Sequence, residues 1–175
     1  MSCTQTLSNI NVDCGANKGG VVELYAHNRS VVSAITVTDG KVTAFTLANN
    51  APEAAKFAFR KQSSGLTSTL TVDQTAGVKF VTSEMAMRFS KMETAKRVAI
   101  QAMSDAEMVC IVKDENGKYW LLGYDSPVTI SAGTGATGTA HTDANEYTIT
   151  LSDTSAEFPY EVDSSAVTTF LNAAA

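Results

Sequence analysis

The side chains that most often carry acid–base or metal chemistry are scarce in this chain of 175 residues. Its two histidines, His27 and His141, have no Cys, Asp or Glu at the spacing of a zinc site. Its three cysteines, Cys3, Cys14 and Cys110, match no metal-binding spacing either. Cys110 lies in an apolar run and is expected to be a small buried hydrophobe. Cys3 and Cys14 are able to pair, although a reducing compartment disfavours that bond.

Two short motifs resemble ligand sites. Residues 133–138 read GTGATG and match G-x-G-x-x-G, but a dinucleotide site needs a helix that opens at the last glycines. Here a polar segment and a strand pattern follow instead. Asp114 and Glu115 beside Asn116-Gly117 suggest calcium, yet the loop is shorter than the twelve-residue calcium pattern. The sequence therefore predicts no catalytic, cofactor-binding or metal-binding residues, and we expect the chain not to be an enzyme.

Basic residues gather between positions 56 and 97, where eight stand against three acidic ones. They are Lys56, Arg60, Lys61, Lys79, Arg88, Lys91, Lys96 and Arg97. A nucleic-acid patch is one interpretation, but the phenylalanines between them have the spacing of core residues. A solvated or intersubunit face is therefore the preferred interpretation.

Charge is divided along the chain, whose net charge is −5. Residues 1–118 carry 13 basic and 11 acidic groups, whereas residues 119–175 carry seven acidic groups and no basic one. Such an uneven distribution of charge bears on the binding partners of a protein rather than on its fold. It is explained either by a solvated acidic tail or by a head-to-tail contact between the acidic side of one subunit and the basic side of the next.

The overall composition is that of an ordinary globular domain. Hydrophobic residues make up 44% of the chain, and Thr, Ser, Val and Ala are abundant while Pro is scarce, which favours β structure. No apolar run approaches the roughly 18 residues of a membrane span, and the N-terminus lacks the pattern of a signal peptide. We expect one domain over residues 1–175, made in the cytoplasm, with no membrane partner.

The strongest local signal is a hairpin over residues 108–124, with a turn at Asn116-Gly117. A two-residue turn predicts that Lys113 faces Trp120 and that Val112 faces Leu121. Both faces of this hairpin are apolar, so we expect it to be covered on both sides and to lie at the centre of the core. Asp39-Gly40 predicts a second tight hairpin between strands over residues 31–38 and 41–47.

The next strands carry a polar face. Thr67, Thr69, Thr71 and Asp73 alternate with apolar residues, which predicts a sheet that borders solvent or an aqueous channel. In residues 78–89 the apolar phase reverses near positions 82–84, which predicts either a bulge or one long strand that changes layers.

One helix is predicted at about residues 91–103, with Ser90 and Glu93 as a capping box. Its apolar arc comprises Met92, Ala95, Val98, Ala99, Ala102 and Met103, and should pack on the central hairpin.

The last third reads as a Gly-rich extended loop or flexible hairpin over residues 126–140, a strand over 146–151 and an edge strand over 158–162 that contains Pro159. The sequence thus predicts a mainly β (α+β) fold, a β-sandwich or barrel of two packed antiparallel sheets flanked by one α-helix. Its parts are an N-terminal arm at 1–20, the sandwich at 21–163, and a C-terminal tail at 164–175, part of which has the pattern of a short helix.

Three segments within residues 80–163 carry a resemblance to a known family. They are VKDENGKYWLLGYD, SAGTGATGTAHTD and EYTITLSDTSAEFPY. Together with the order of the predicted elements, they resemble bacteriophage tail tube proteins, a family of virion structural proteins. The resemblance implies a tail-tube-like fold whose subunits form homo-oligomeric rings that stack around a channel for DNA. It also implies a place in the virion, contact with other virion proteins, and non-sequence-specific passage of DNA.

On this resemblance, Thr67, Thr69, Thr71 and Asp73 are expected to face the lumen. A basic lumen would hold phosphates, so Arg88, Lys91, Lys96 and Arg97 are expected to face neighbouring subunits, opposite Asp153, Glu157 and Glu161. The alternatives are a head-to-tail connector ring or capsid-associated virion protein, and a monomeric ligand-binding β-sandwich. A metal-free hydrolase is a further alternative that the two histidines hardly support.

Overall fold

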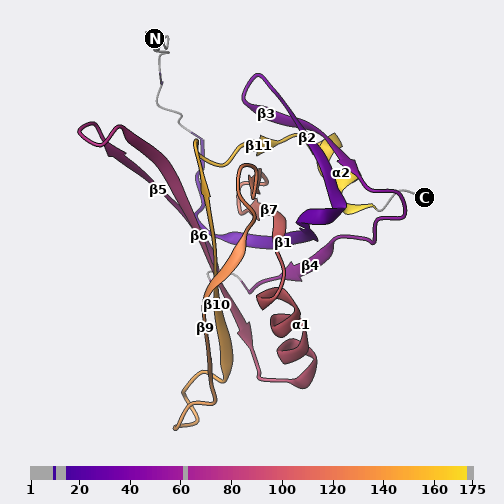
Figure 1. The fold of residues 1–175 in the computed structure, drawn as a ribbon. Helices are drawn as coiled ribbons and strands as arrows, with labels where there is room; N and C mark the ends of the chain where they lie inside the picture. The colour runs from indigo at the N-terminus through magenta and orange to yellow at the C-terminus, as the bar shows by residue number, and fades with distance from the viewer. Residues whose placement is uncertain (1–9, 11–14, 61–62, 173–175) are drawn as a thin grey trace.

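The computed structural model describes residue 10, residues 15–60 and residues 63–172. The fold is mainly β, as the sequence predicted, and it has two α-helices where one was expected to flank the sheets (Figure 1). A seven-stranded sheet has the order β2-β3-β11-β8-β7-β1-β4, and a four-stranded sheet has the order β5-β6-β10-β9. Cys3 and Cys14, whose pairing the sequence left open, lie outside the described residues.

The seven-stranded sheet is built from short strands. They are β1 (Val21–Asn28), β2 (Val32–Thr38), β3 (Lys41–Leu47), β4 (Ala55–Ala58), β7 (Met108–Asp114), β8 (Tyr119–Leu122) and β11 (Glu161–Val162), with a 3-10 turn at Arg29–Val31. The sheet is mixed rather than antiparallel, because β11 runs parallel to β3. The predicted edge strand around Pro159 is also wrong, since β11 begins after Pro159 and lies between β3 and β8.

The four-stranded sheet contains the long strands. They are β5 (Gly65–Asp73), β6 (Val78–Ser90), β9 (Thr129–Ala136) and β10 (Glu146–Ser155). β6 pairs without a register shift on both sides, so it contains no bulge. Val81, Ser83, Met85 and Met87 face inward, which leaves Val78 and Phe80 on the outer face. Within the segment predicted as an extended loop or flexible hairpin, residues 129–136 form strand β9, which pairs with β10.

Two hydrophobic clusters hold the layers together. One lies between the sheets and includes Met85, Leu151, Leu24 and Cys110. The other lies between the seven-stranded sheet and helix α2 (Ser164–Leu171), whose Phe170 is fully buried. The described part of the C-terminal tail predicted at 164–175 is therefore a packed helix.

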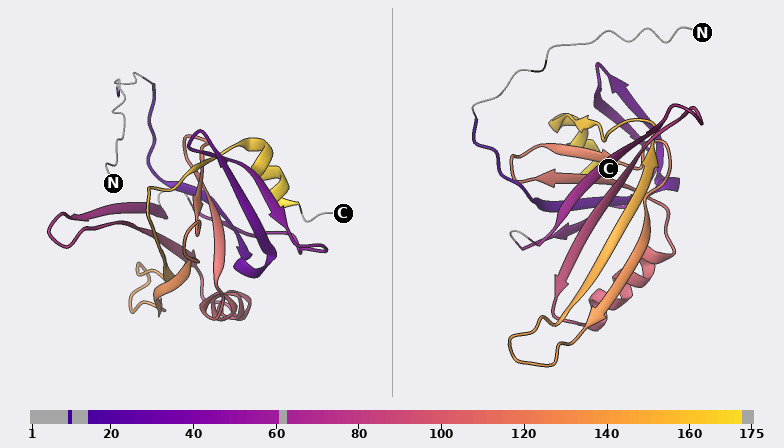
Figure 2. Two further views of the ribbon diagram at one scale, coloured as in Figure 1. Left: turned by 45° about the horizontal axis from the view of Figure 1, so that its top comes forward. Right: turned by 90° about the vertical axis from the view of Figure 1, so that its left-hand side faces the viewer.

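The four-stranded sheet crosses the seven-stranded sheet and extends beyond the shared core at both ends (Figures 1 and 2).

The central hairpin is covered on both sides as predicted, but its register differs by one residue. Val112 pairs with Trp120 and Ile111 with Leu121. The loop has three residues, because Asp114 and Lys118 close it and Gly117 has a φ of 80°. Asp114 Oδ1 accepts hydrogen bonds from the amides of Asn116 and Lys118, each at 2.8 Å, and these bonds favour the longer loop. The predicted hairpin at Asp39-Gly40 is confirmed, with φ values of 51° and 76°.

Helix α1 (Thr94–Ser104) differs from the prediction in its start and in its buried face. β6 continues through Ser90, and Glu93 stands at the N-cap, so the predicted capping box does not form. Met103 is buried and Ile100 packs on the core, whereas Val98, Ala99 and Ala102 are exposed. α1 therefore lies at the margin of the core between the sheets, and not on the central hairpin (Figure 1).

Candidate assembly surface

The outer face of the four-stranded sheet is mostly polar, with Val78 and Phe80 as apolar residues near the β5–β6 turn. Thr67, Thr69, Thr71 and Asp73 share this face as predicted, and all four are exposed. Pairing brings further small polar side chains to the same side, because directly opposed residues share a face. The surface, which we call the threonine face, also includes Thr82, Glu84, Ala86, Arg88, Thr134, Glu146, Thr148, Thr150, Ser152 and Thr154.

Most of these residues were missed as candidates from the sequence. The alternation in residues 146–151 indicated that Tyr147, Ile149 and Leu151 point inward, which leaves Thr148 and Thr150 outward. The alternation does not reveal that β10 pairs with β6 in the four-stranded sheet and not with a strand of the seven-stranded sheet. The threonine face is therefore a product of strand order.

Arg88 lies on the threonine face, which corrects the expectation that it points away from Thr67 and its neighbours. Arg88 follows Glu84 by four residues in a regular strand and pairs with Thr148. Its Nε donates to Glu146 Oε1 at 2.9 Å, and its Nη2 also contacts that oxygen. The guanidinium is therefore paired within the sheet. The face carries Arg88 against Asp73, Glu84 and Glu146, a net charge of −2.

The other predicted basic interface residues lie around the start of α1. Lys91 and Lys96 both form ion pairs with Glu93, and hydrogen bonding to Glu93 raises the pKa of Lys91. Lys96 Nζ also donates to the carbonyls of Ser90 and Lys91. Arg97 is exposed, and no carboxylate within the described ranges forms an ion pair with it.

The predicted acidic interface residues are mostly engaged within the chain. The prediction that Asp153 lies at a subunit interface is wrong, because its side chain is buried. Asp153 is only 6% exposed, and its Oδ2 accepts a hydrogen bond from the amide of Gly123 at 2.8 Å. Burial raises the pKa of Asp153. Glu157 Oε2 accepts from the hydroxyl of Tyr160 at 2.9 Å. Burial, and then this bond, raise the pKa of Tyr160 to about 12.

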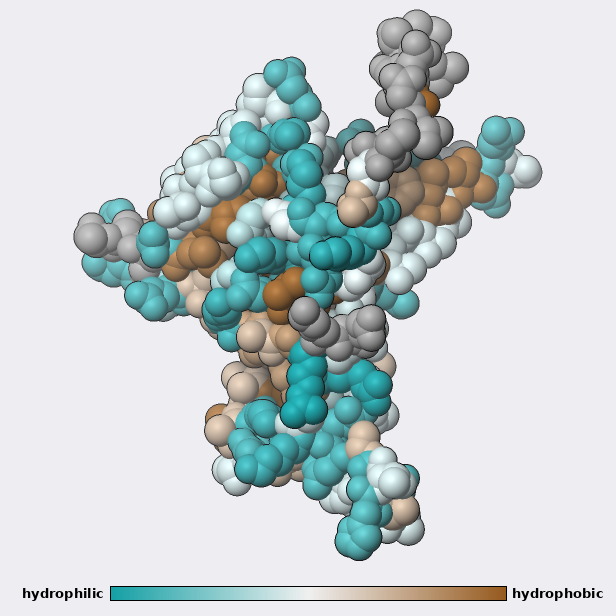
Figure 3. Space-filling view, turned by 180° about the vertical axis from the view of Figure 1, so that it is seen from behind, coloured by the Kyte–Doolittle hydropathy of each residue, from teal (hydrophilic) through white to brown (hydrophobic). Residues whose placement is uncertain are grey.

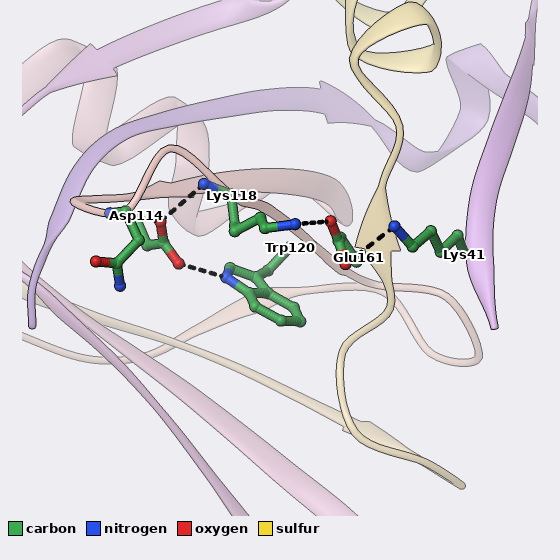
Figure 4. A network of polar contacts seen from close by, with 6 residues as sticks. Lys41, Asp114, Lys118, Trp120 and Glu161 are labelled. Carbon is green, nitrogen blue, oxygen red and sulfur yellow. Dashed lines mark hydrogen bonds and ion pairs between the residues drawn. The ribbon is translucent and has the colours of Figure 1, made fainter. Parts of the chain in front are cut away.

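Glu161 in β11 is linked through two lysines to β3 and to the turn between β7 and β8 (Figure 4). Lys118 Nζ lies 2.6 Å from one oxygen and Lys41 Nζ lies 3.4 Å from the other. The hydrogen bond from Lys118 lowers the pKa of Glu161. On the neighbouring turn, Asp114 Oδ2 accepts from Trp120 Nε1 at 3.0 Å. Of the acidic residues in the last third, Glu146 and Glu161 form ion pairs with basic residues of the same chain among the described residues.

The edges of the four-stranded sheet are open. Within the described ranges, β5 and β9 each have a hydrogen-bonded neighbour on one side only. Neither strand contains a lysine or proline, the residues that commonly block such an edge. Both strands are mostly exposed.

His27 and Cys110, whose residue types often act in acid–base or thiol chemistry, have structural roles here. His27 is buried, and its Nε2 lies 2.8 Å from the carbonyl oxygen of Phe170, which ties β1 to α2. Burial strongly raises the pKa of the Cys110 thiol, which keeps it protonated and unreactive. Among the described residues, no group of three or more His, Cys, Asp or Glu is arranged to hold a metal ion.

The glycine motif belongs to the sheet and not to a phosphate loop. A Cβ at Gly133 would lie 3.0 Å from Ile149 Cδ1, and one at Gly135 would lie 2.9 Å from Tyr147 Cε1. The two glycines therefore let large side chains of β10 pack across β9. Gly138 has a φ of 73° in the following turn, and no helix begins there.

Comparisons with protein-family models, with curated proteins and with solved structures give no match. Within the described part of the chain, no helix is both long and apolar enough to cross a bilayer.

Proposed function

We propose that this chain is a virion structural protein, a tail tube subunit whose copies form rings around a DNA-conducting channel. The observation that carries the proposal is the threonine face, bounded by the two open edges of the same sheet. An open, exposed edge without blocking residues is a template for a strand of another chain. Pairing β5 of one copy with β9 of the next would extend the sheet from subunit to subunit.

Closure of such a sheet into a ring would remove every open edge of the four-stranded sheets. The threonine face would then line the interior. Its short Thr, Ser and Ala side chains and its slight negative charge suit a channel that lets DNA pass without holding it, because DNA affinity arises mainly from cationic contacts to phosphate. The resemblance to tail tube proteins points to the same assembly.

The first test is the size of the purified protein, by light scattering and negative-stain imaging across a concentration series. We expect rings or tubes. A protein that stays strictly monomeric at high concentration contradicts the proposal.

Hydrogen–deuterium exchange then tests the edges. Amides of residues 65–73 and 129–136 should become protected in assembled material relative to monomer. β2 provides a matched control, because it is an edge of the larger sheet that the proposal leaves free. Equal gains at β2, or none at β5 and β9, would show that copies associate in another way.

A further inference from the structure

The side chain of Asn116 holds residues 17 and 18 against the turn of the central hairpin. Asn116 Oδ1 accepts a hydrogen bond from the amide of Lys18 at 2.9 Å. Asn116 Nδ2 donates one hydrogen bond to Asn17 Oδ1 at 2.9 Å and another to the carbonyl oxygen of Lys18 at 3.0 Å. One side-chain amide thus uses its oxygen and both of its N–H bonds on a segment that lies 98 residues earlier in the chain. We call these three hydrogen bonds the Asn116 clasp.

The segment held by the Asn116 clasp forms part of the wall of a cleft of about 390 Å³. Residues 18–20 line this cleft together with Leu66 and Trp120. The space-filling view shows an apolar patch on the projecting β5–β6 hairpin, to which Leu66 belongs (Figure 3). A second tie holds the same segment, because the amide of Glu115 donates to the carbonyl oxygen of Gly20 at 3.1 Å. The contacts of the turn therefore keep residues 17–20 beside apolar side chains.

Asn116 is also the asparagine of the chain that is most open to loss of its side-chain amide. It precedes Gly117, and this is the only Asn-Gly pair in the sequence. Glycine has no side chain that would obstruct attack by its backbone nitrogen on the preceding asparagine. Both residues are exposed, so water and base reach them. A Cβ at Gly117 would have no heavy atom within 4 Å, so the space beside the turn is open.

The reaction is a deamidation that consumes only water. Solvent base takes the proton from the Gly117 nitrogen, which attacks Asn116 Cγ and forms a new N–Cγ bond. The Cγ–Nδ2 bond breaks, and the amide group takes a proton from solvent and leaves as ammonia. Water then opens the resulting succinimide ring at one of its two carbonyl carbons. The product is aspartate or isoaspartate at position 116, and no electrons are transferred to or from the protein.

The folded turn opposes this reaction, and the Asn116 clasp is part of the reason. The Gly117 amide donates to the carbonyl oxygen of Asp114 at 3.1 Å, which makes its proton harder to remove. Both N–H bonds of Asn116 Nδ2 are engaged with acceptors of residues 17 and 18. Departure of Nδ2 breaks both of these hydrogen bonds, so the clasp and the deamidation compete for the same amide.

The product does not fit the clasp. An aspartate at position 116 keeps an acceptor for the amide of Lys18, but an oxygen takes the place of Nδ2. That oxygen would face Asn17 Oδ1 and the carbonyl oxygen of Lys18, which now lie 2.9 and 3.0 Å from Nδ2. Acceptors that face each other without a proton between them repel, and the new charge also joins Asp114 and Glu115 in the same turn.

We propose that Asn116 is a site of spontaneous deamidation that the clasp restrains, and that its conversion releases residues 17–20 from the central hairpin. The release is permanent, because the ammonia is lost to solvent. It uncovers the cleft that contains Leu66 and Trp120. This inference goes beyond the proposed function and does not rest on it, since the clasp, the turn and the cleft belong to a single chain.

Peptide mapping by mass spectrometry, at intervals during incubation of the folded protein at mildly alkaline pH, tests the modification. Asn116 should convert several-fold faster than any other asparagine of the chain, and isoaspartate should be part of the product. Asn17→Ala removes one acceptor of the clasp and should accelerate the conversion.

Gly117→Asn is the control for the chemistry. Asparagine tolerates the positive φ of 80° at this position, and its Cβ has free space there. Its side chain crowds the attacking nitrogen, so conversion at position 116 should slow several-fold. The proposal is overturned if Asn116 reacts no faster than the other asparagines, if Gly117→Asn leaves its rate unchanged, or if Asn17→Ala does not raise it.

Hydrogen exchange measured by NMR tests the release. In Asn116→Asp, which reproduces one product, the amides of Lys18 and Glu115 should exchange at least roughly tenfold faster than in the wild type, because two hydrogen bonds of the clasp are lost. Wild-type protein that has deamidated during incubation should behave in the same way.

Asn17→Asp is the matched control. It adds the same charge on the other side of the clasp but keeps an acceptor for Asn116 Nδ2, so the two amides should stay protected. Equal acceleration in both variants would mean that added charge alone frees the segment, and unchanged exchange in Asn116→Asp would mean that the product stays bound. Either result overturns the release, and both measurements are valid whether or not the chain assembles.

Discussion

The amide of Gly123 donates a hydrogen bond to the buried carboxylate of Asp153, and this bond joins the two sheets. Gly123 follows β8 of the larger sheet, and Asp153 lies in β10 of the smaller one. Gly123 has a φ of 89°, and a Cβ there would lie 2.9 Å from the carbonyl oxygen of Met108. Only glycine therefore fits at this position. The pair fixes where the sheets meet, and thereby how the threonine face is held against the rest of the subunit.

Replacement of Asp153 by Asn should stabilise the protein at neutral pH by on the order of 1 kcal/mol. Burial raises the pKa of Asp153, so the folded state favours the protonated acid. Stability from this group is therefore greatest below the ordinary pKa of about 4 and falls as the pH rises through the folded value. Asn keeps an acceptor for Gly123 and has no charge. Urea denaturation from pH 4 to pH 8 should give a flatter stability profile for the variant.

Asp153→Ala is the control for that prediction. It removes the acceptor and leaves the Gly123 amide buried without a partner, which should cost about 1–3 kcal/mol. If Asn and Ala destabilise equally at pH 7, the charge of Asp153 is not the costly feature.

The burial of Asp153 was not predicted from the sequence, which indicated a surface position. In a Thr- and Ser-rich strand an Asp reads as solvent-exposed, but its position in the alternation matches Ile149 and Leu151, which point into the core. Most of the strands, the two-faced hairpin and the mainly β class follow from local patterns. Strand order, the exposed face of α1 and the pairing of Arg88 depend on long-range contacts that no local pattern contains.

The charge balance on the threonine face gives a prediction about DNA. Glu146→Gln should leave Arg88 unpaired on a face that otherwise lacks basic residues. Assembled Glu146→Gln protein should bind double-stranded DNA several-fold more tightly than wild type at low salt, and the gain should disappear as salt rises. Fluorescence anisotropy measures both. Adding Arg88→Gln should abolish the gain, and a gain that survives it would point to another basic surface.

Glu23 should make folding sensitive to acid. Its oxygens lie 2.6 Å from Lys56 Nζ and 3.5 Å from Lys113 Nζ, and one accepts from the Tyr25 hydroxyl at 2.6 Å. The bond from Lys56, followed by that from Tyr25, lowers the pKa of Glu23 from 4.5 to about 2. The associated stability is present above pH 4.5 and is lost as the pH falls towards 2.

Glu23→Gln should therefore cost about 1–2 kcal/mol at pH 7, since the exposed lysine is partly screened, and little at pH 2. Thermal unfolding between pH 2 and pH 7 measures the difference. Glu84→Gln is the matched control, because Glu84 is exposed and has no ion pair within the described residues. An equal loss in both variants would mean that the network around Glu23 contributes nothing specific.

Asp114 is the residue that sets the register of the central hairpin, and its two oxygens have separable roles. Oδ1 accepts from the amides of Asn116 and Lys118 within the turn, and Oδ2 accepts from Trp120 Nε1 (Figure 4). Asp114→Asn keeps an acceptor for the turn and loses the bond to Trp120, so it should cost about 1 kcal/mol. Asp114→Ala loses all three bonds and should cost about 2–3 kcal/mol.

The Trp120 bond provides a readout that is independent of stability. Trp120 is the only tryptophan in the chain, so its fluorescence reports on this site alone. Both variants should shift its emission in the folded state, because both lose the acceptor at Nε1. Only Asp114→Ala should weaken the protection of the 114–118 amides in hydrogen exchange. If Asp114→Asn opens the turn as much as Asp114→Ala does, the bonds to Oδ1 are not what selects the three-residue loop over the two-residue turn that Asn116-Gly117 predicts.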